Sequence, residues 1–147
     1  MHKNISFRSA ALIVKDKKLL FAKHINHPCY YLVGGGVEEG EASKTAVIRE
    51  IYEEIGLTLE VDKLVMIQER FHKVNEQRHH EVVFLYLIKN CDDINILDGT
   101  FSDQGTKETL HWLPIDKLSE FEIVPEFLKS KSFEDMNYIE HVVIKEY

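Results

Sequence analysis

The sequence is poor in cysteine and proline, and it has no long apolar run. The two cysteines, Cys29 and Cys91, are not spaced like a redox or metal pair, so a disulfide framework is excluded and a reduced, cytoplasmic setting is expected. No stretch approaches the roughly 20 apolar residues that a transmembrane helix needs. The N-terminus also lacks the apolar core of a signal peptide. We therefore expect neither membrane insertion nor secretion.

Positive charge is also scarce. Lys and Arg number 18 against 25 Asp and Glu, which gives a net charge of -7 and argues against non-specific binding to nucleic acid. A small phosphorylated ligand remains compatible with this charge if bound metal ions reverse its local sign. With 147 residues, of which 44% are hydrophobic, the chain is long enough to bury one core, and we expect a single domain over residues 1–147.

Alternating and β-branched segments predict more strands than helices. Strands are expected over residues 5–14, 19–23, 30–33, 59–69, 81–89 and 108–113, with an edge strand over 138–146 that could also pair in a dimer. Turn residues are expected at 15–18 and 73–77, and short helices at 114–118 and 124–128. This order of elements suits an α+β sandwich with a mixed sheet.

One stretch, Gly35 to Leu57, organises the rest of the chain. Glycines 34–36 follow a short predicted strand and allow the backbone to approach a ligand closely. Ser43 is placed to cap a helix that Gly56 ends. The apolar residues of this helix, Ala46, Val47, Ile51 and Ile55, recur at spacings of three and four and predict one buried stripe.

The second half of this helix concentrates carboxylates. Glu50, Glu53 and Glu54 lie at i, i+3 and i+4, so they project from one side of the helix and repel one another. They also lie near the C-terminal end, where the helix dipole disfavours anions. Arg49 can pair with Glu53 at i+4 but cannot neutralise three carboxylates. A hard divalent cation held by oxygen ligands is the natural complement.

The full motif is more specific than three glutamates. Gly35, five residues, Glu41, seven residues and then R-E-I-Y-E-E-I-G-L from Arg49 to Leu57 match every defined position of the Nudix box, so the chain resembles a Nudix hydrolase. Only one upstream feature departs from the family, which commonly has a proline where this chain has Val33. That change loosens the entry to the loop but removes no expected ligand.

The resemblance implies a fold, a reaction and a set of residues. It implies a Nudix-type α/β/α sandwich around a central mixed sheet, and hydrolysis of a pyrophosphate linkage in a nucleoside diphosphate joined to another group. Mg²⁺ is the implied cofactor, with Mn²⁺ as a substitute, and a homodimer is common in the family. The implied metal ligands are Glu50, Glu53, Glu54 and the Gly35 carbonyl, and the implied catalytic residues are Glu53, Glu54, Arg49 and Glu41.

Residues outside the motif are candidates for binding the substrate. Phosphates and bases need donors and stacking partners, and the candidates are Arg8, Arg70, Phe71, His79 and Glu81. A further catalytic carboxylate is expected before the strand of Trp112, where Glu108 and Asp103 both qualify. A transition-metal site at His72, His79 and His80 is disfavoured because no further ligand completes it.

Three functions remain open. The first is hydrolysis of a nucleoside diphosphate derivative, including a modified nucleoside triphosphate. The second is hydrolysis of ADP-ribose or a sugar nucleotide. The third, of a different class, is a non-catalytic ligand sensor, which the intact motif disfavours.

Overall fold

The strands form two sheets in the computed structural model, which describes residues 5–147. The first sheet has the order β10-β6-β7-β1-β5 and contains β1 (Ile5–Leu12), β5 (Gly34–Gly36), β6 (Val61–Val74), β7 (Gln77–Ile88) and β10 (Glu140–Lys145). The second has the order β2 (Val14–Lys15), β3 (Lys18–His24), β4 (Tyr30–Leu32) and β9 (Ile123–Val124), with β8 (Glu108–Pro114) paired to β3. The helical elements are α1 (Ser43–Ile55) and the 3₁₀ helices η1 (Cys91–Asp93), η2 (Ile115–Glu120) and η3 (Glu126–Ser130).

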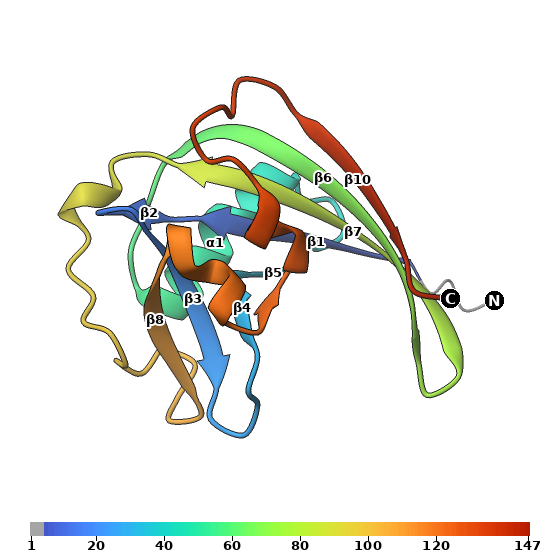
Figure 1. Cartoon of the computed structure of the whole chain (residues 1–147), viewed down its shortest axis with the longest axis horizontal. Helices are drawn as coiled ribbons and strands as arrows, with labels where there is room; N and C mark the ends of the chain where they lie inside the picture. The colour runs from blue at the N-terminus through green and yellow to red at the C-terminus, as the bar shows by residue number, and fades with distance from the viewer. Residues whose placement is uncertain (1–4) are drawn as a thin grey trace.

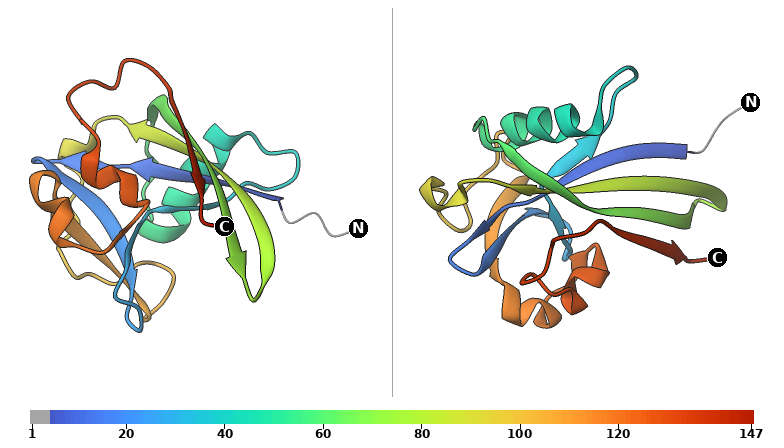
Figure 2. Two further views of the ribbon diagram at one scale, coloured as in Figure 1. Left: turned by 45° about the vertical axis from the view of Figure 1, so that its right-hand side comes forward. Right: turned by 90° about the horizontal axis from the view of Figure 1, so that it is seen from above.

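The layers confirm the predicted α+β sandwich. The first sheet is mixed, because β1 runs parallel to β7 and β10 parallel to β6, whereas β6 and β7 are antiparallel. Figure 2 shows α1 on one side of the strands and the later 3₁₀ helices on the other. The predicted single domain over residues 1–147 stays a prediction, and its first four residues lie outside the described part.

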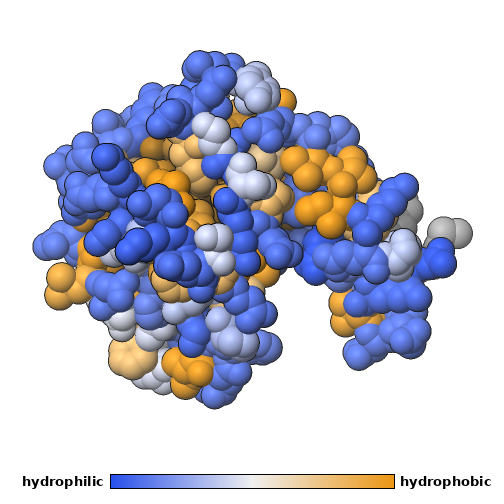
Figure 3. All heavy atoms as spheres, viewed as in Figure 1, coloured by the Kyte–Doolittle hydropathy of each residue, from blue (hydrophilic) through white to orange (hydrophobic). Residues whose placement is uncertain are grey.

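The hairpin of β6 and β7 is longer than predicted. Its strands stay in register to Val74 and Gln77, and only Asn75 and Glu76 make the turn, both with positive φ of 50° and 67°. Two positive φ values are typical of the tight hairpin turn that matches strand twist. The hairpin tip extends beyond the body in Figure 1, and Figure 3 shows a notch beside it. The sequence near the hairpin tip is polar and therefore looks like a loop, which is why the predicted strands were too short.

The tail differs from prediction in helix type and in one added strand, because Val124, expected to begin a helix, lies in β9 and pairs with Tyr31. Both expected short helices are 3₁₀ turns, η2 and η3. The last strand, β10, lies at the sheet edge as predicted, paired with β6.

Helix α1 has the expected stop but a different start. Gly56 adopts a left-handed conformation with φ of 73°, and its N–H donates to the Tyr52 carbonyl. Ala42, not Ser43, occupies the N-cap, and the Ser43 hydroxyl pairs instead with the Tyr86 hydroxyl at 2.6 Å. The Val47 and Ile51 side chains are fully buried in the core. This packing fixes which side of α1 presents its carboxylates to the glycine strand β5.

Candidate active site

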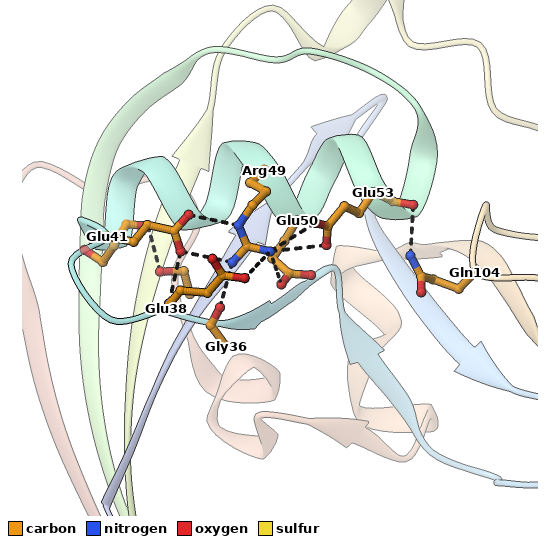
Figure 4. A network of polar contacts seen from close by, with 9 residues as sticks. Gly36, Glu38, Glu41, Arg49, Glu50, Glu53 and Gln104 are labelled. Atoms are coloured by element: carbon orange, nitrogen blue, oxygen red, sulfur yellow. Dashed lines mark hydrogen bonds and ion pairs between the residues drawn. The ribbon is translucent and has the colours of Figure 1, made fainter.

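Arg49 contacts three of the carboxylates of the site. Its guanidinium donates to both oxygens of Glu41 at 2.9 and 3.0 Å, to Glu50 at 2.9 Å, to both oxygens of Glu53 at 3.2 Å, and to the Gly36 carbonyl at 2.9 Å. Figure 4 shows these side chains converging from α1 and the loop before it. Such charge-assisted bonds with planar geometry orient carboxylates as well as attract them.

The surroundings of Glu41 lower its pKa, and those of Glu50 fix its position. The hydrogen bond from Arg49 lowers the pKa of Glu41 to about 2, and the Glu38 N–H, which also donates to it, adds to the effect. Glu50 lies against Gly35, where a Cβ would collide with its carboxylate. Glycine at position 35 therefore makes room for the carboxylate beside the β5 backbone.

Glu54 receives none of the hydrogen bonds that Arg49 donates. It is only 8% exposed, and its Oε2 has no hydrogen-bond partner among the described residues. Burial, together with the charges of Glu108 and Glu50, raises its pKa to about 8, and the Gly34 backbone and Arg8 oppose this rise. A buried, unpaired carboxylate is costly unless a cation or proton joins it.

Glu108 is the carboxylate that the fold brings to Glu54. It begins β8, and its Oε2 accepts a hydrogen bond of 2.6 Å from the Tyr31 hydroxyl on β4. Its Oε1 is buried without a partner among residues 5–147. Burial and the hydrogen bond to Glu108 raise the pKa of Tyr31, which keeps the phenol protonated as a donor.

Asp103 has a different position. Its backbone N–H donates to the Glu54 carbonyl at 2.7 Å, and the Gln104 side chain donates to the Glu53 carbonyl at 3.0 Å. These contacts satisfy carbonyls that have no partner within the last turn of α1. Of the two accessory candidates, Glu108 thus presents an unpartnered carboxylate oxygen toward the site, and Asp103 ends the helix.

A cavity of about 410 Å³ lies beside Tyr31, and none of the carboxylates described above lines it. Arg8, Arg70 and Glu81 line it, as does Tyr31, which therefore connects the cavity to Glu108. Arg70 is held by both oxygens of Glu146 at 3.1 Å. The volume lies in the range of small-molecule sites, about 300–1,000 Å³.

Two of the sequence candidates lie elsewhere. Phe71 stacks on His80 with ring centres 4.2 Å apart, and His79 stacks on His72 at 5.5 Å; neither lines the cavity. Conversely, sequence reasoning passed over Tyr31 and Gln68, which do line it. The available signal for Gln68 was a lone amide within the apolar run of a predicted strand.

The carboxylates are not arranged around a common metal position. Within residues 5–147, no group of three or more His, Cys, Asp or Glu side chains has a geometry that could hold a metal ion. Arg49 donates hydrogen bonds to Glu50 and Glu53 but not to Glu54, whose pKa is raised by burial and by the charges of Glu108 and Glu50. The donor chemistry nevertheless fits a hard cation, since the oxygens are carboxylate and one of them is buried and unpartnered. No helix in the described part of the chain is long and apolar enough to cross a membrane.

A comparison with known protein families identifies the domain. The NUDIX domain model matches residues 6–133, and the chain belongs to that family. The mutator MutT protein of Bacillus halodurans has a similar structure, with a TM-score of 0.74 at 16% identity over 96% of this chain and 91% of that one.

Two relatives share parts of the sequence. An ADP-ribose pyrophosphatase of Methanocaldococcus jannaschii is 47% identical over 57 residues, covering 37% of this chain and 34% of that protein. A probable DHNTP pyrophosphohydrolase of Lactococcus lactis is 32% identical over 91 residues, covering 58% of this chain and 55% of that one. The matches thus span between about a third and just over half of these relatives' lengths.

Proposed function

We propose that this chain is a divalent-metal-dependent pyrophosphohydrolase acting on a small nucleoside-diphosphate derivative. The observation that carries the proposal is the charge asymmetry around α1. Arg49 pairs with Glu41, Glu50 and Glu53, whereas Glu54 is buried near Glu108 and its Oε2 has no hydrogen-bond partner among the described residues. A cation is the partner that this asymmetry lacks. A cavity of about 410 Å³ is linked to Glu108 through Tyr31, which lines it.

We assign the residues three roles, which are metal binding, orientation of the carboxylates and proton acceptance. Glu50, Glu54 and the Gly35 carbonyl would hold Mg²⁺ or Mn²⁺, with Glu53 as a further ligand. The metal, when bound, would neutralise phosphate oxygens and acidify a water molecule. Arg49 and Glu41 hold the carboxylates in orientation. Glu53 and Glu108 are the groups that can accept the proton of an attacking water.

The second candidate reaction is hydrolysis of ADP-ribose or a sugar nucleotide, favoured by the named activity of the Methanocaldococcus jannaschii relative. Both reactions break a pyrophosphate linkage with the same carboxylates. They differ in the group beyond the second phosphate, which would lie in or near the cavity of Arg8 and Arg70. A substrate panel separates them.

The test is chromatographic detection of the hydrolysis products from a panel of substrates. Nucleoside triphosphates, oxidised triphosphates and DHNTP would release phosphate or pyrophosphate, ADP-ribose and sugar nucleotides would release a nucleoside monophosphate and a sugar phosphate, and dinucleoside polyphosphates would release two nucleotides. We expect turnover with Mg²⁺ that EDTA abolishes. Glu53→Gln and Glu54→Gln should each lower kcat by about 10²–10⁴-fold. Glu60→Gln, which changes an exposed glutamate just beyond the motif, is the matched control and should keep full activity. Nucleotide binding without turnover of any substrate would instead support a ligand sensor.

A further inference from the structure

Another cavity, of about 300 Å³, lies at the C-terminal end of α1, and we call it the Phe101 cavity. Glu54 lines it from the helix, and the loop of residues 95–103 supplies most of its other lining residues. The cavity beside Tyr31 is lined by seven charged side chains, whereas the Phe101 cavity is lined by two, those of Glu54 and Asp103. The rest of its lining is mainly apolar and includes Ile55, Ile96, Leu97, Phe101 and Leu110. The two cavities therefore suit ligand groups of different polarity.

Glu54 is the reason to regard the Phe101 cavity as a ligand site. Its side chain is only 8% exposed, it lines the cavity, and its Oε2 has no hydrogen-bond partner among residues 5–147. A buried polar atom without a partner is explained by a group that binds from outside the chain. Glu108, whose charge acts on Glu54, is linked through Tyr31 to the charged cavity. The two carboxylates thus connect a charged cavity with a mainly apolar one.

Two large apolar side chains beside the Phe101 cavity are exposed to solvent. Leu97 is 74% exposed and Phe101 is 56% exposed. The loop that carries them is fixed to β8, because the Gly99 N–H donates to the Leu110 carbonyl at 2.7 Å and Phe101 forms an antiparallel bridge with Thr109. An ordered loop therefore imposes the exposure, and a ligand that covers these side chains removes apolar surface from water.

The lining limits the chemistry of the ligand. The volume lies at the lower end of small-molecule sites, about 300–1,000 Å³, so the cavity suits one part of a small molecule. An exposed phenylalanine ring stacks on the face of a flat ring, and every nucleobase has such a face. A nucleoside diphosphate derivative carries this ring at one end and its phosphates in the middle. That order matches an apolar cavity followed by the carboxylates of Glu54 and Glu108.

We propose that the Phe101 cavity binds the nucleobase of the substrate and that the base stacks on the ring of Phe101. This inference rests on the proposed function for its substrate class. The diphosphate would lie at Glu54 and Glu108, and the group beyond it would extend toward Arg8 in the cavity beside Tyr31. Because stacking uses the face of the base, the site accepts different bases with similar affinity.

The experiment follows binding by the fluorescence of Trp112 and by calorimetry in the presence of Mg²⁺. Trp112 is the single tryptophan of the sequence, and its indole N–H donates to the Ile96 carbonyl of the loop at 2.8 Å. The probes are the α,β-methylene diphosphates of the four common nucleosides, whose central linkage resists hydrolysis. Methylenediphosphonate, which has the same linkage but no nucleoside, is the reference probe.

Three substitutions separate the ring of Phe101 from its apolar bulk. Phe101→Tyr keeps the ring, Phe101→Leu keeps apolar bulk without the ring, and Phe101→Ala removes both. Tyr138→Ala is the matched control, because it removes an aromatic side chain that is 60% exposed and lines neither cavity. Urea unfolding of each variant reports stability in the same buffer.

The nucleotide probes should bind the wild type, Phe101→Tyr and Tyr138→Ala about 10-fold or more tightly than methylenediphosphonate does, and they should change the fluorescence of Trp112. Phe101→Leu and Phe101→Ala should each reduce this ratio about 5–100-fold. The binding of methylenediphosphonate and the urea midpoint should stay unchanged in every variant, because Phe101 is exposed in the free protein.

A ratio that survives in Phe101→Leu or Phe101→Ala, or an equal loss in Phe101→Tyr, would overturn the assignment. A wild type that binds the nucleotides no more tightly than methylenediphosphonate, or without any change in Trp112 fluorescence, would also overturn it. The hydrolysis panel is independent of this result. Turnover with an unchanged ratio leaves the proposed function standing without this base site, whereas a reduced ratio without turnover retains the base site and rejects the hydrolase.

Discussion

The carboxylates around α1 fall into two groups with opposite surroundings. Glu41, Glu50 and Glu53 share the guanidinium of Arg49 through bonds of 2.9–3.2 Å. Glu54 and Glu108 lie at the buried end, where each keeps one oxygen without a partner among the described residues. The site therefore holds three carboxylates whose charge is paired with Arg49, and two carboxylates, Glu54 and Glu108, that each keep an unpaired oxygen.

The difference lies in what each group contributes. The Arg49 group stabilises the folded chain as it stands, because each bond pairs opposite charges. The pair of Glu54 and Glu108 costs folding free energy until a cation or proton binds there, because burial, together with the charges of Glu108 and Glu50, raises the pKa of Glu54 to about 8. Sites that sacrifice stability in this way are candidates for function.

The largest effect expected outside the motif of Gly35 to Leu57 concerns Glu108. If its free oxygen accepts a proton during hydrolysis, Glu108→Gln should lower kcat by about 10²-fold with little change in KM. Tyr31→Phe, which removes only the hydroxyl that orients Glu108, should give a smaller decrease in kcat. Asp103→Asn serves as the control and should leave kcat near the wild-type value. The measurement is steady-state kcat and KM on the best substrate of the panel. A large loss of kcat in Asp103→Asn with none in Glu108→Gln would show that Asp103, and not Glu108, is the accessory carboxylate.

The sequence predicted the Arg49 group well and the Glu108 contact poorly, for a physical reason. The motif from Gly35 to Leu57 is local, so helical spacing and a glycine stop were enough to place its side chains. Glu108 reaches Glu54 only because β8 pairs with β3 and β4 brings Tyr31 alongside. Such pairings link residues far apart in the chain, and a single sequence does not specify which strands adjoin.

The cavity illustrates the same limit. Arg8, Arg70 and Glu81 were proposed from residue type alone, and the fold places them along one cavity. Phe71 and His79 were proposed on equal grounds but stack on histidines of the neighbouring strand instead. Strand faces alternate with a period of two, so adjacent residues such as Arg70 and Phe71 point to opposite sides. The extended hairpin register decides which of them can reach a ligand.

The next effect is on stability and has opposite signs for the two groups. In EDTA at neutral pH, Glu54→Gln should raise the free energy of unfolding by about 1–2 kcal/mol, because the amide avoids the cost of burying a carboxyl that ionises freely once unfolded. Arg49→Met should lower it by about 1–3 kcal/mol, because several charge-assisted bonds are lost. Urea unfolding measures both. Destabilisation of the metal-free chain by Glu54→Gln would show that Glu54 is compensated after all.

The smallest effect is a change in the pH dependence of stability at Glu41. Its pKa is lowered to about 2, compared with an ordinary value of about 4.3. A lowered pKa means that the ionised carboxylate stabilises the fold above the ordinary pKa and that this contribution is lost as pH falls toward 2. The difference in unfolding free energy between wild type and Glu41→Gln should therefore be constant from pH 6 to 8 and shrink below about pH 4.3. Glu39→Gln, on the same loop and exposed, should show no such change. A difference that stays constant through the acid range would mean that the bonds from Arg49 do not depend on the charge of Glu41, and the neutralised group would then owe its order to geometry rather than to ion pairing.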